Sequence, residues 1–219
     1  MIRKLLAEWM GTYALVFFGT GAIMVNRFHE GVLGHMGVCI VFGLVVMTMI
    51  YAVGDISGAH LNPAVSLGFY ADGRMKFPEM LTYSAVQLLG ATSASFTCSL
   101  MFGVQHGLGE TVPSGGLWGA AFGMETLLTF ILMFVILRVS TGSKEKGITA
   151  AIAIGGVVTM AAMVGGPVSG ASMNPARSFG PALMSGNWES FWVYLAGPYL
   201  GCVMAVMLCR ILHGEKTSS

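Results

Sequence analysis

The chain has 219 residues, of which 55% are hydrophobic and only 10% are charged, and its formal net charge is +1. Soluble domains carry about 25% charged residues, so this chain has too few polar side chains to cover a globule in water. The near-zero net charge and the lack of a basic patch with interleaved aromatic residues give no indication of nucleic-acid binding. The composition is typical of a protein embedded in a lipid bilayer.

Six apolar stretches are each long enough to cross a bilayer, which takes about 20 helical residues. They are approximately Leu5–Val25, Gly34–Val53, Met80–Val104, Gly119–Val139, Gly147–Gly166 and Phe191–Leu212. The first stretch contains Glu8 and continues as a full span, so it is interpreted as a helix of the protein and not as a cleaved signal. Two shorter apolar segments, Pro63–Tyr70 and Pro175–Met184, cannot cross and are predicted to be re-entrant half-helices.

Each short segment follows one copy of a repeated motif. The copies are Ser57-Gly58-Ala59-His60-Leu61-Asn62-Pro63-Ala64 and Ser169-Gly170-Ala171-Ser172-Met173-Asn174-Pro175-Ala176. An Asn is a favoured N-cap, and a Pro suits the first helical position because its φ is pre-set and its missing N–H would have no helical partner. Each copy therefore predicts an irregular loop that opens a short helix. Such backbone is tolerated within a bilayer only where it is buried in protein or lines a watery cavity.

The repeat extends beyond the two motifs. Glu8 with Thr12 in the first span has the same spacing as Glu125 with Thr129 in the fourth. Each half is thus helix, helix, re-entrant loop and helix, over about residues 1–105 and 117–213. Because three spans per half is an odd number, the second half must enter the membrane from the opposite side. The predicted fold is an all-α membrane protein in one domain, residues 1–219, with six transmembrane helices, two half-helices and an inverted 3+3 repeat.

Basic residues set the expected orientation. If the six spans alternate, most of these residues fall on one side, namely Arg3, Lys4, Arg74, Lys76, Arg138, Lys144, Lys146, Arg210 and Lys216. Only Arg27 and Arg177 fall on the other side. The positive-inside rule then predicts a multi-pass protein of the cell (inner) membrane with both termini in the cytoplasm.

On these motifs the sequence resembles the aquaporin (major intrinsic protein) family over essentially its whole length. The resemblance is carried by the twin Asn-Pro-Ala triplets, by Arg177 directly after the second triplet, and by the pair Glu8 and Glu125. The segments Thr111–Gly115 and Gly166–Ser178 are similar to the nodulin-like intrinsic proteins and their bacterial relatives. The resemblance implies a passive channel that is not an enzyme, a homotetramer with one pore per subunit, and neither cofactor nor metal.

Three residues are the first candidates for solute contact. Asn62 and Asn174 are expected to donate hydrogen bonds to a passing oxygen atom, where two half-helix N-termini focus positive potential. Capping of the half-helices is the alternative role for both side chains. Arg177 is expected to present donors to neutral solutes and to repel cations, because a guanidinium within a membrane is expensive and usually functional. Snorkelling to the outer interface is the alternative for this arginine.

The resemblance also implies a narrow filter formed by Phe42, Ala162, Ala171 and Arg177, placed by their distance from each Asn. Ala162 stands where water-selective members carry His, so the aperture should be wider and one wall apolar. Leu195 matches glycerol-conducting and nodulin-like members. We therefore expect water to pass together with small neutral solutes, either glycerol-like polyols or undissociated metalloid hydroxides, while protons and ions are excluded.

The loop backbone is expected to line the path, at Gly58, Ala59, His60, Leu61, Gly170, Ser172 and Met173. His60 is interpreted as a packed wall residue, with a gate as the alternative. Glu8 and Glu125, one for each loop, are interpreted as acceptors for loop N–H groups, with a proton relay as the alternative. Two other functions stay open, namely a strictly water-selective aquaporin and an inverted-repeat secondary transporter. The transporter would need an ion or proton site in the pathway.

Overall fold

The computed structural model of the protein describes residues 1–104, 107–140 and 144–213, with the backbone alone for residues 144–148 and 213. The side chains of Lys144, Lys146 and Lys216 therefore lie outside the described part. Within it the long helices are α1 (Ile2–Phe28), α2 (Gly34–Ser57), α4 (Phe77–Phe102), α5 (Trp118–Val139), α6 (Lys144–Ser169) and α8 (Val193–His213). The short helices are α3 (Pro63–Ala71) and α7 (Pro175–Ser185), and two 3-10 turns, η1 (Gly107–Gly109) and η2 (Ser114–Gly116), precede α5.

Five of the described helices are long and apolar enough to cross a membrane by length and composition, namely α2, α4, α5, α8 and the Thr149–Ser169 part of α6. With 27 residues, α1 is also long enough to span. Its mean hydropathy is lowered by polar residues such as Glu8, Thr12 and Thr20, whose side chains are fully buried inside the protein. These side chains do not face lipid, so the prediction of six long helices and two half-helices is confirmed.

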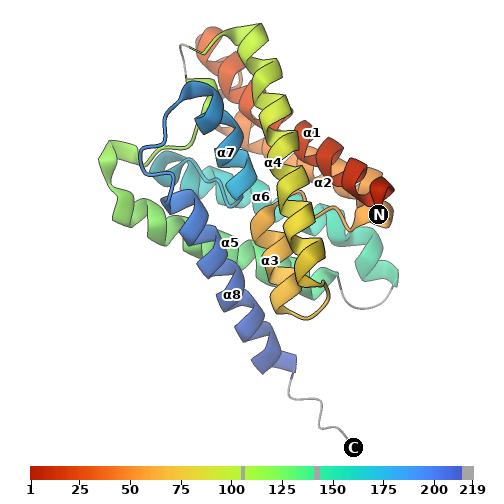
Figure 1. Ribbon diagram of the computed structural model, residues 1–219. Coiled ribbons are helices and arrows are strands. Elements are labelled where there is room, and N and C mark those ends of the chain that lie inside the picture. Colours follow the sequence, from red (N-terminus) through yellow and green to blue (C-terminus); the bar gives the residue numbers. More distant parts are fainter. Residues whose placement is uncertain (105–106, 141–143, 214–219) are drawn as a thin grey trace, which may run out of the picture.

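The helices form two similar sets, and each half-helix packs on the opposite set. In the first set α1 packs against α2 and α4, and in the second set α5 packs against α6 and α8. Helices α2 and α6 join the two sets. Figure 1 shows α3 beside α8 and α7 beside α4, so each half-helix has crossed to the last long helix of the other set. This exchange is what an inverted repeat with two re-entrant loops requires.

Glycine residues bring the helix backbones into close contact. A Cβ atom on Gly155 of α6 would lie 2.7 Å from the Gly43 carbonyl oxygen of α2. A Cβ atom on Gly90 of α4 would lie 2.5 Å from the Trp9 carbonyl oxygen of α1. These distances are shorter than van der Waals contact, so the two helix crossings leave no room for a larger side chain.

Replacing Gly155 by Ala should lower the stability of the protein by about 1–3 kcal/mol, because the added methyl group overpacks the crossing of α2 and α6. The measurement is thermal unfolding of the purified protein in detergent. Gly156→Ala is the matched control, since a Cβ atom there meets nothing within 4 Å. The control should match or exceed the wild type, because Ala is the better helix former. Equal unfolding temperatures for the two variants would show that the crossing is not tightly packed.

Candidate functional site

Both motif loops follow the same unusual backbone path. Gly58 and Gly170 have φ angles of 89° and 81°, and Leu61 and Met173 have φ angles of 51° and 53°. The left-handed region suits glycine, whereas an L side chain there costs about 1–2 kcal/mol. Ala59 and Ala171 also have positive φ angles in these loops. A backbone held this way needs strong interactions from its surroundings.

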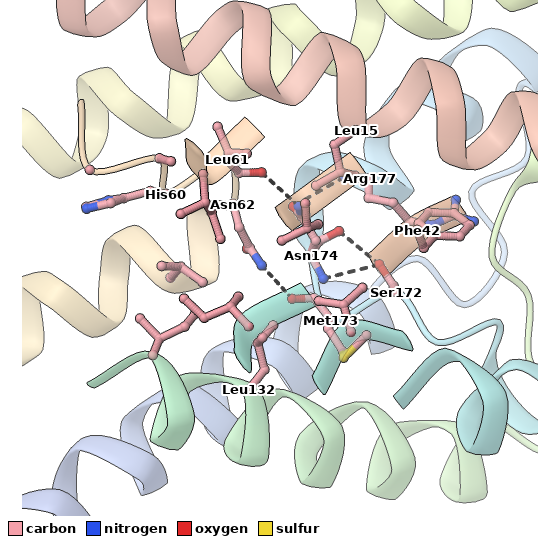
Figure 2. Close-up of a pocket in the computed structure, with 18 of the residues that line it drawn as sticks. Leu15, Phe42, His60, Leu61, Asn62, Leu132, Ser172, Met173, Asn174 and Arg177 are labelled. Atoms are coloured by element: carbon pink, nitrogen blue, oxygen red, sulfur yellow. Dashed lines mark hydrogen bonds between the residues drawn. The ribbon is translucent and has the colours of Figure 1, made fainter. Parts of the chain in front are cut away.

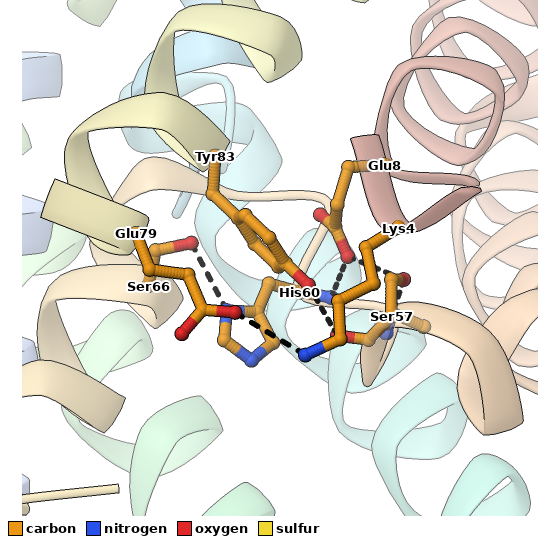
Figure 3. A network of polar contacts seen from close by, with 8 residues as sticks. Lys4, Glu8, Ser57, His60, Ser66, Glu79 and Tyr83 are labelled. Carbon is orange, nitrogen blue, oxygen red and sulfur yellow. Dashed lines mark hydrogen bonds and ion pairs between the residues drawn. The ribbon is translucent and has the colours of Figure 1, made fainter. Parts of the chain in front are cut away.

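The first loop is held by a buried carboxylate from α1. Glu8 is fully buried, and its carboxylate accepts hydrogen bonds from the backbone N–H groups of His60 at 2.9 Å and Leu61 at 2.7 Å. It also accepts a bond of 2.7 Å from the Ser57 hydroxyl (Figure 3). The Gln87 side chain of α4 donates a further bond at 2.8 Å. All four donors point at one charged group.

The second loop is held in the same way by α5. Glu125 is fully buried and accepts hydrogen bonds from the backbone N–H groups of Ser172 at 2.9 Å and Met173 at 2.7 Å. The Ser169 hydroxyl donates a third bond at 2.7 Å. Bonds to an ionised acceptor are about twice as strong as bonds between neutral groups. The two carboxylates therefore occupy equivalent positions under the two loops.

Two tyrosines that the sequence analysis did not single out complete the support. The Tyr83 hydroxyl donates to the Ser57 carbonyl oxygen at 3.0 Å, and the Tyr194 hydroxyl donates to the Ser169 carbonyl oxygen at 2.8 Å. The repeat contains the signal that could have found them, because a tyrosine follows each motif serine at nearly the same distance in the sequence.

The two asparagines bind across the interface between the loops. The Asn62 side-chain oxygen accepts from the Ala64 N–H, which caps α3, and its nitrogen donates to the Met173 carbonyl oxygen at 2.7 Å. The Asn174 side-chain nitrogen donates to the Leu61 carbonyl oxygen at 2.8 Å (Figure 2). The oxygen of Asn174 likewise caps α7. Capping and a central position are thus combined in the same two side chains.

A narrow cavity of about 100 Å³ runs past this pair, and two groups of residues line it. The first group comes from the two motif loops and consists of Gly58, Ala59, His60, Leu61, Asn62, Ala171, Ser172, Met173 and Asn174. The second group consists of apolar residues of the helices, including Leu15, Val46, Leu132, Ile154 and Val158. The remaining triplet residues, Pro63, Ala64, Pro175 and Ala176, are buried at the starts of the half-helices and do not line this cavity.

A second, wider cavity of about 360 Å³ opens beyond the first. It is bordered by Arg27 and His35, and Gly170 lines this cavity and not the narrow one. Among the described residues, those that line both cavities are Phe42, Ala162, Ala171 and Arg177. The structure therefore brings together the four residues that the sequence analysis grouped, at the point where the wide cavity meets the narrow one.

The Arg177 guanidinium lies inside the protein and does not snorkel to its surface. The residue is only 2% exposed, and its Nη1 donates to the Gly109 carbonyl oxygen at 2.7 Å. Its central carbon lies 5.1 Å from the centre of the Phe42 ring, which is close enough for a cation–π interaction (Figure 2). Its Nε has no hydrogen-bond partner among the described residues.

The position of Phe42 depends on a glycine outside the cavity. A Cβ atom on Gly19 of α1 would overlap the Phe42 ring, so only glycine lets the ring lie where it does. His60 stacks on Phe69 with 4.5 Å between ring centres, and its Nδ1 lies 3.1 Å from the Ser66 hydroxyl. This packing fits a wall residue (Figure 3). Leu195 lines neither cavity and is 39% exposed, so it does not set the aperture.

Comparison with known proteins agrees with this geometry. Residues 1–209 match the family model described as Major intrinsic protein. The chain belongs to this family. It is 48% identical to Aquaporin NIP1-1 of Zea mays over 97% of this chain and 75% of that protein. It is 42% identical to Nodulin-26 of Glycine max over 97% of this chain and 78% of that protein.

A solved structure of a family member is also similar. The X-ray structure of the aquaglyceroporin from Plasmodium falciparum has a TM-score of 0.85 and 27% sequence identity, over 94% of each chain. From its sequence and structural relatives we conclude that this major intrinsic protein is an integral multi-pass membrane channel for water and small neutral solutes, and not an enzyme. The resemblance to the nodulin-like members is confirmed by these relatives.

Replacing Glu125 by Gln should lower the free energy of unfolding by about 3 kcal/mol, because an NH₂ group would face the N–H donors of Ser172 and Met173. Thermal unfolding in detergent measures the change. Glu189→Gln is the control, since Glu189 is exposed and should tolerate the same substitution. An unchanged unfolding temperature for the Glu125 variant would mean that the carboxylate does not hold the loop.

Proposed function

We propose that the two connected cavities are the solute path and that Phe42, Ala162, Ala171 and Arg177 are its selectivity filter. We further propose that glycerol-like polyols or undissociated metalloid hydroxides pass with water. The supporting observation is that these four residues line both cavities. A solute that moves from the wide cavity to the narrow one must therefore pass between them.

The filter combines two kinds of surface. Ala162 and Ala171 offer small apolar side chains, and Arg177 offers the N–H donors of its guanidinium. A polyol carries hydroxyl groups along one side and C–H groups along the other, so it can meet both surfaces at once. A larger polar ring at residue 162 would remove this fit and would leave space for water alone.

The narrow cavity also combines hydrogen-bonding groups with apolar side chains. Hydroxyl groups face the loop carbonyls and the amides of Asn62 and Asn174, while carbon atoms face the apolar side chains of the helices. Each amide nitrogen carries two N–H groups, of which one binds the opposite loop. The other is available to a solute oxygen. The N-termini of α3 and α7 add positive potential at this point, which opposes a migrating proton or cation.

We propose that Glu8 and Glu125 support the loops and take no part in proton transfer. Both oxygens of each carboxylate accept hydrogen bonds from the protein, and neither residue lines the two cavities. A coupled transporter needs an ion or proton site that the solute can reach. The passive mechanism is the one that these contacts favour.

We propose that both termini are cytoplasmic and that the protein lies in the cell (inner) membrane. Lys4 pairs with Glu79 at 3.2 Å, and Arg74 donates to the Ser140 hydroxyl at 3.0 Å. These contacts gather basic residues near the chain start, the α3–α4 connection and the end of α5. Arg27 borders the wide cavity, so the wide cavity is assigned to the outer side by the positive-inside rule.

We propose a homotetramer in which each chain, as one domain with halves of about residues 1–105 and 117–213, holds its own pore. Gly197 and Gly201 contact α5 within the chain, since a Cβ atom on either would meet the α5 backbone or Glu125. Gly119 and Gly123 of α5 have nothing within 4 Å of an added Cβ. Such a small-residue pair allows another helix to approach closely in a membrane.

Stopped-flow light scattering of proteoliposomes tests the filter. The wild type should pass both water and glycerol, and Ala162→His should keep its water permeability while its glycerol permeability falls by about tenfold or more. Ala162→Ser is the control, because it adds little volume and should retain both permeabilities. A wild type that passes water and excludes glycerol would instead support the strictly water-selective alternative.

Removing the filter charge should open the pore to ions. Arg177→Val should raise the proton permeability of proteoliposomes, because a buried positive charge no longer repels the proton. An internal pH-sensitive dye reports the leak after a pH step. Arg3→Gln removes a charge from the exposed start of α1 and should not change it. Normal water flow without any proton leak in the Arg177 variant would contradict this role.

A further inference from the structure

The linker before α5 contacts α7 through three consecutive residues. Each contact is a hydrogen bond of 2.7 Å, and the pairs are Gly109 carbonyl with Arg177 Nη1, Glu110 carboxylate with Ser185 hydroxyl, and Thr111 hydroxyl with Ser178 hydroxyl. Arg177 lies in the first turn of α7 and Ser185 is its last residue. Eight residues of helix span about 12 Å, so the linker is bound to α7 near both ends.

The turn that presents the Gly109 carbonyl is tight. Leu108 is fully buried with a φ angle of 45°, and Gly109 has a φ angle of 68° with the Thr20 Cβ only 2.9 Å from an added Cβ. The Glu110 N–H donates to the Gly107 carbonyl oxygen at 2.7 Å and closes the turn. Glu110 therefore holds the turn through its backbone and is itself bound to α7 through its side chain.

We propose that Glu110 is a positioning residue of the filter. Its bond to Ser185 fixes the turn at the height where the Gly109 carbonyl accepts from Arg177. The guanidinium then keeps one N–H group directed at the linker, while the Phe42 ring lies beside it. This inference rests on the proposed function, since it takes Arg177 to be part of the filter.

Loss of the Glu110–Ser185 bond should lower glycerol permeability more than water permeability. When the turn shifts, the Arg177 Nη1 loses its carbonyl acceptor, and a buried N–H group without a partner is unfavourable. The guanidinium then turns toward the nearest remaining acceptors, which are solute and water molecules in the path. The aperture narrows, and glycerol is hindered more than water because it is larger.

The experiment compares glycerol and water permeabilities of proteoliposomes with equal channel content. Glu110→Ala and Ser185→Ala should each lower the glycerol-to-water ratio by about threefold or more, and the double variant should fall no further. Glu110→Gln should keep the ratio, because the amide oxygen still accepts from the Ser185 hydroxyl. Glu189→Ala removes an exposed carboxylate from the α7–α8 connection and should also leave the ratio unchanged.

Three results would overturn the inference. The first is a wild-type ratio in both alanine variants, which would mean that the bond affects folding alone. The second is a Glu110→Gln ratio as low as that of Glu110→Ala, which would mean that the charge and not the bond acts on the path. The third is an additive effect of the two alanine substitutions in the double variant, which would mean that the two residues act separately.

Failure of the proposed function would be seen separately, as exclusion of glycerol by the wild type. The same variants are then compared by water permeability alone. A parallel loss of water flow in Glu110→Ala and Ser185→Ala, retained in Glu110→Gln, would still support the positioning role. Unchanged water flow in both alanine variants would overturn it.

Discussion

Leu61 and Met173 each bind through both polar groups of the backbone, and the centre of the molecule depends on these bonds. The N–H of each residue donates to the buried carboxylate of its own set, and the carbonyl of each accepts from the asparagine of the other set. Because both residues have positive φ angles, they would not keep this conformation alone. Glu8 is therefore connected through Leu61 to Asn174, the residue that caps the opposite half-helix α7.

Much of this arrangement could be predicted from the sequence, because the signals are local or repeated. Apolar length indicated the long helices, and an Asn followed by Pro marked the start of each half-helix at the residue where the structure begins it. Hydropathy alone does not identify α1 as a membrane span, since its polar residues are buried against protein and not exposed to lipid. The grouping of Phe42 and Ala162 with Arg177 came from family resemblance, and no physical pattern in the sequence would have brought them together.

Other parts could not be predicted, for a different physical reason. The acceptor for Arg177 is the carbonyl of Gly109, and every residue has a carbonyl, so the sequence carries no mark of which one is used. The linker has no helical or strand period that would place Glu110 beside Ser185. The role of Gly19 is equally hidden, since its importance lies in the space that it leaves for a ring on another helix.

The packing of α3 against α8 has a consequence for the order of assembly. A chain is made and inserted from its N-terminus, and regions near that end can begin to fold first. The first half-helix nevertheless has one of its main neighbours in α8, the last helix that the structure describes. Until that helix is inserted, α3 lacks this neighbour, and the Asn62 amide has no second loop to bind. The centre of the molecule is therefore completed only after α8 has been inserted.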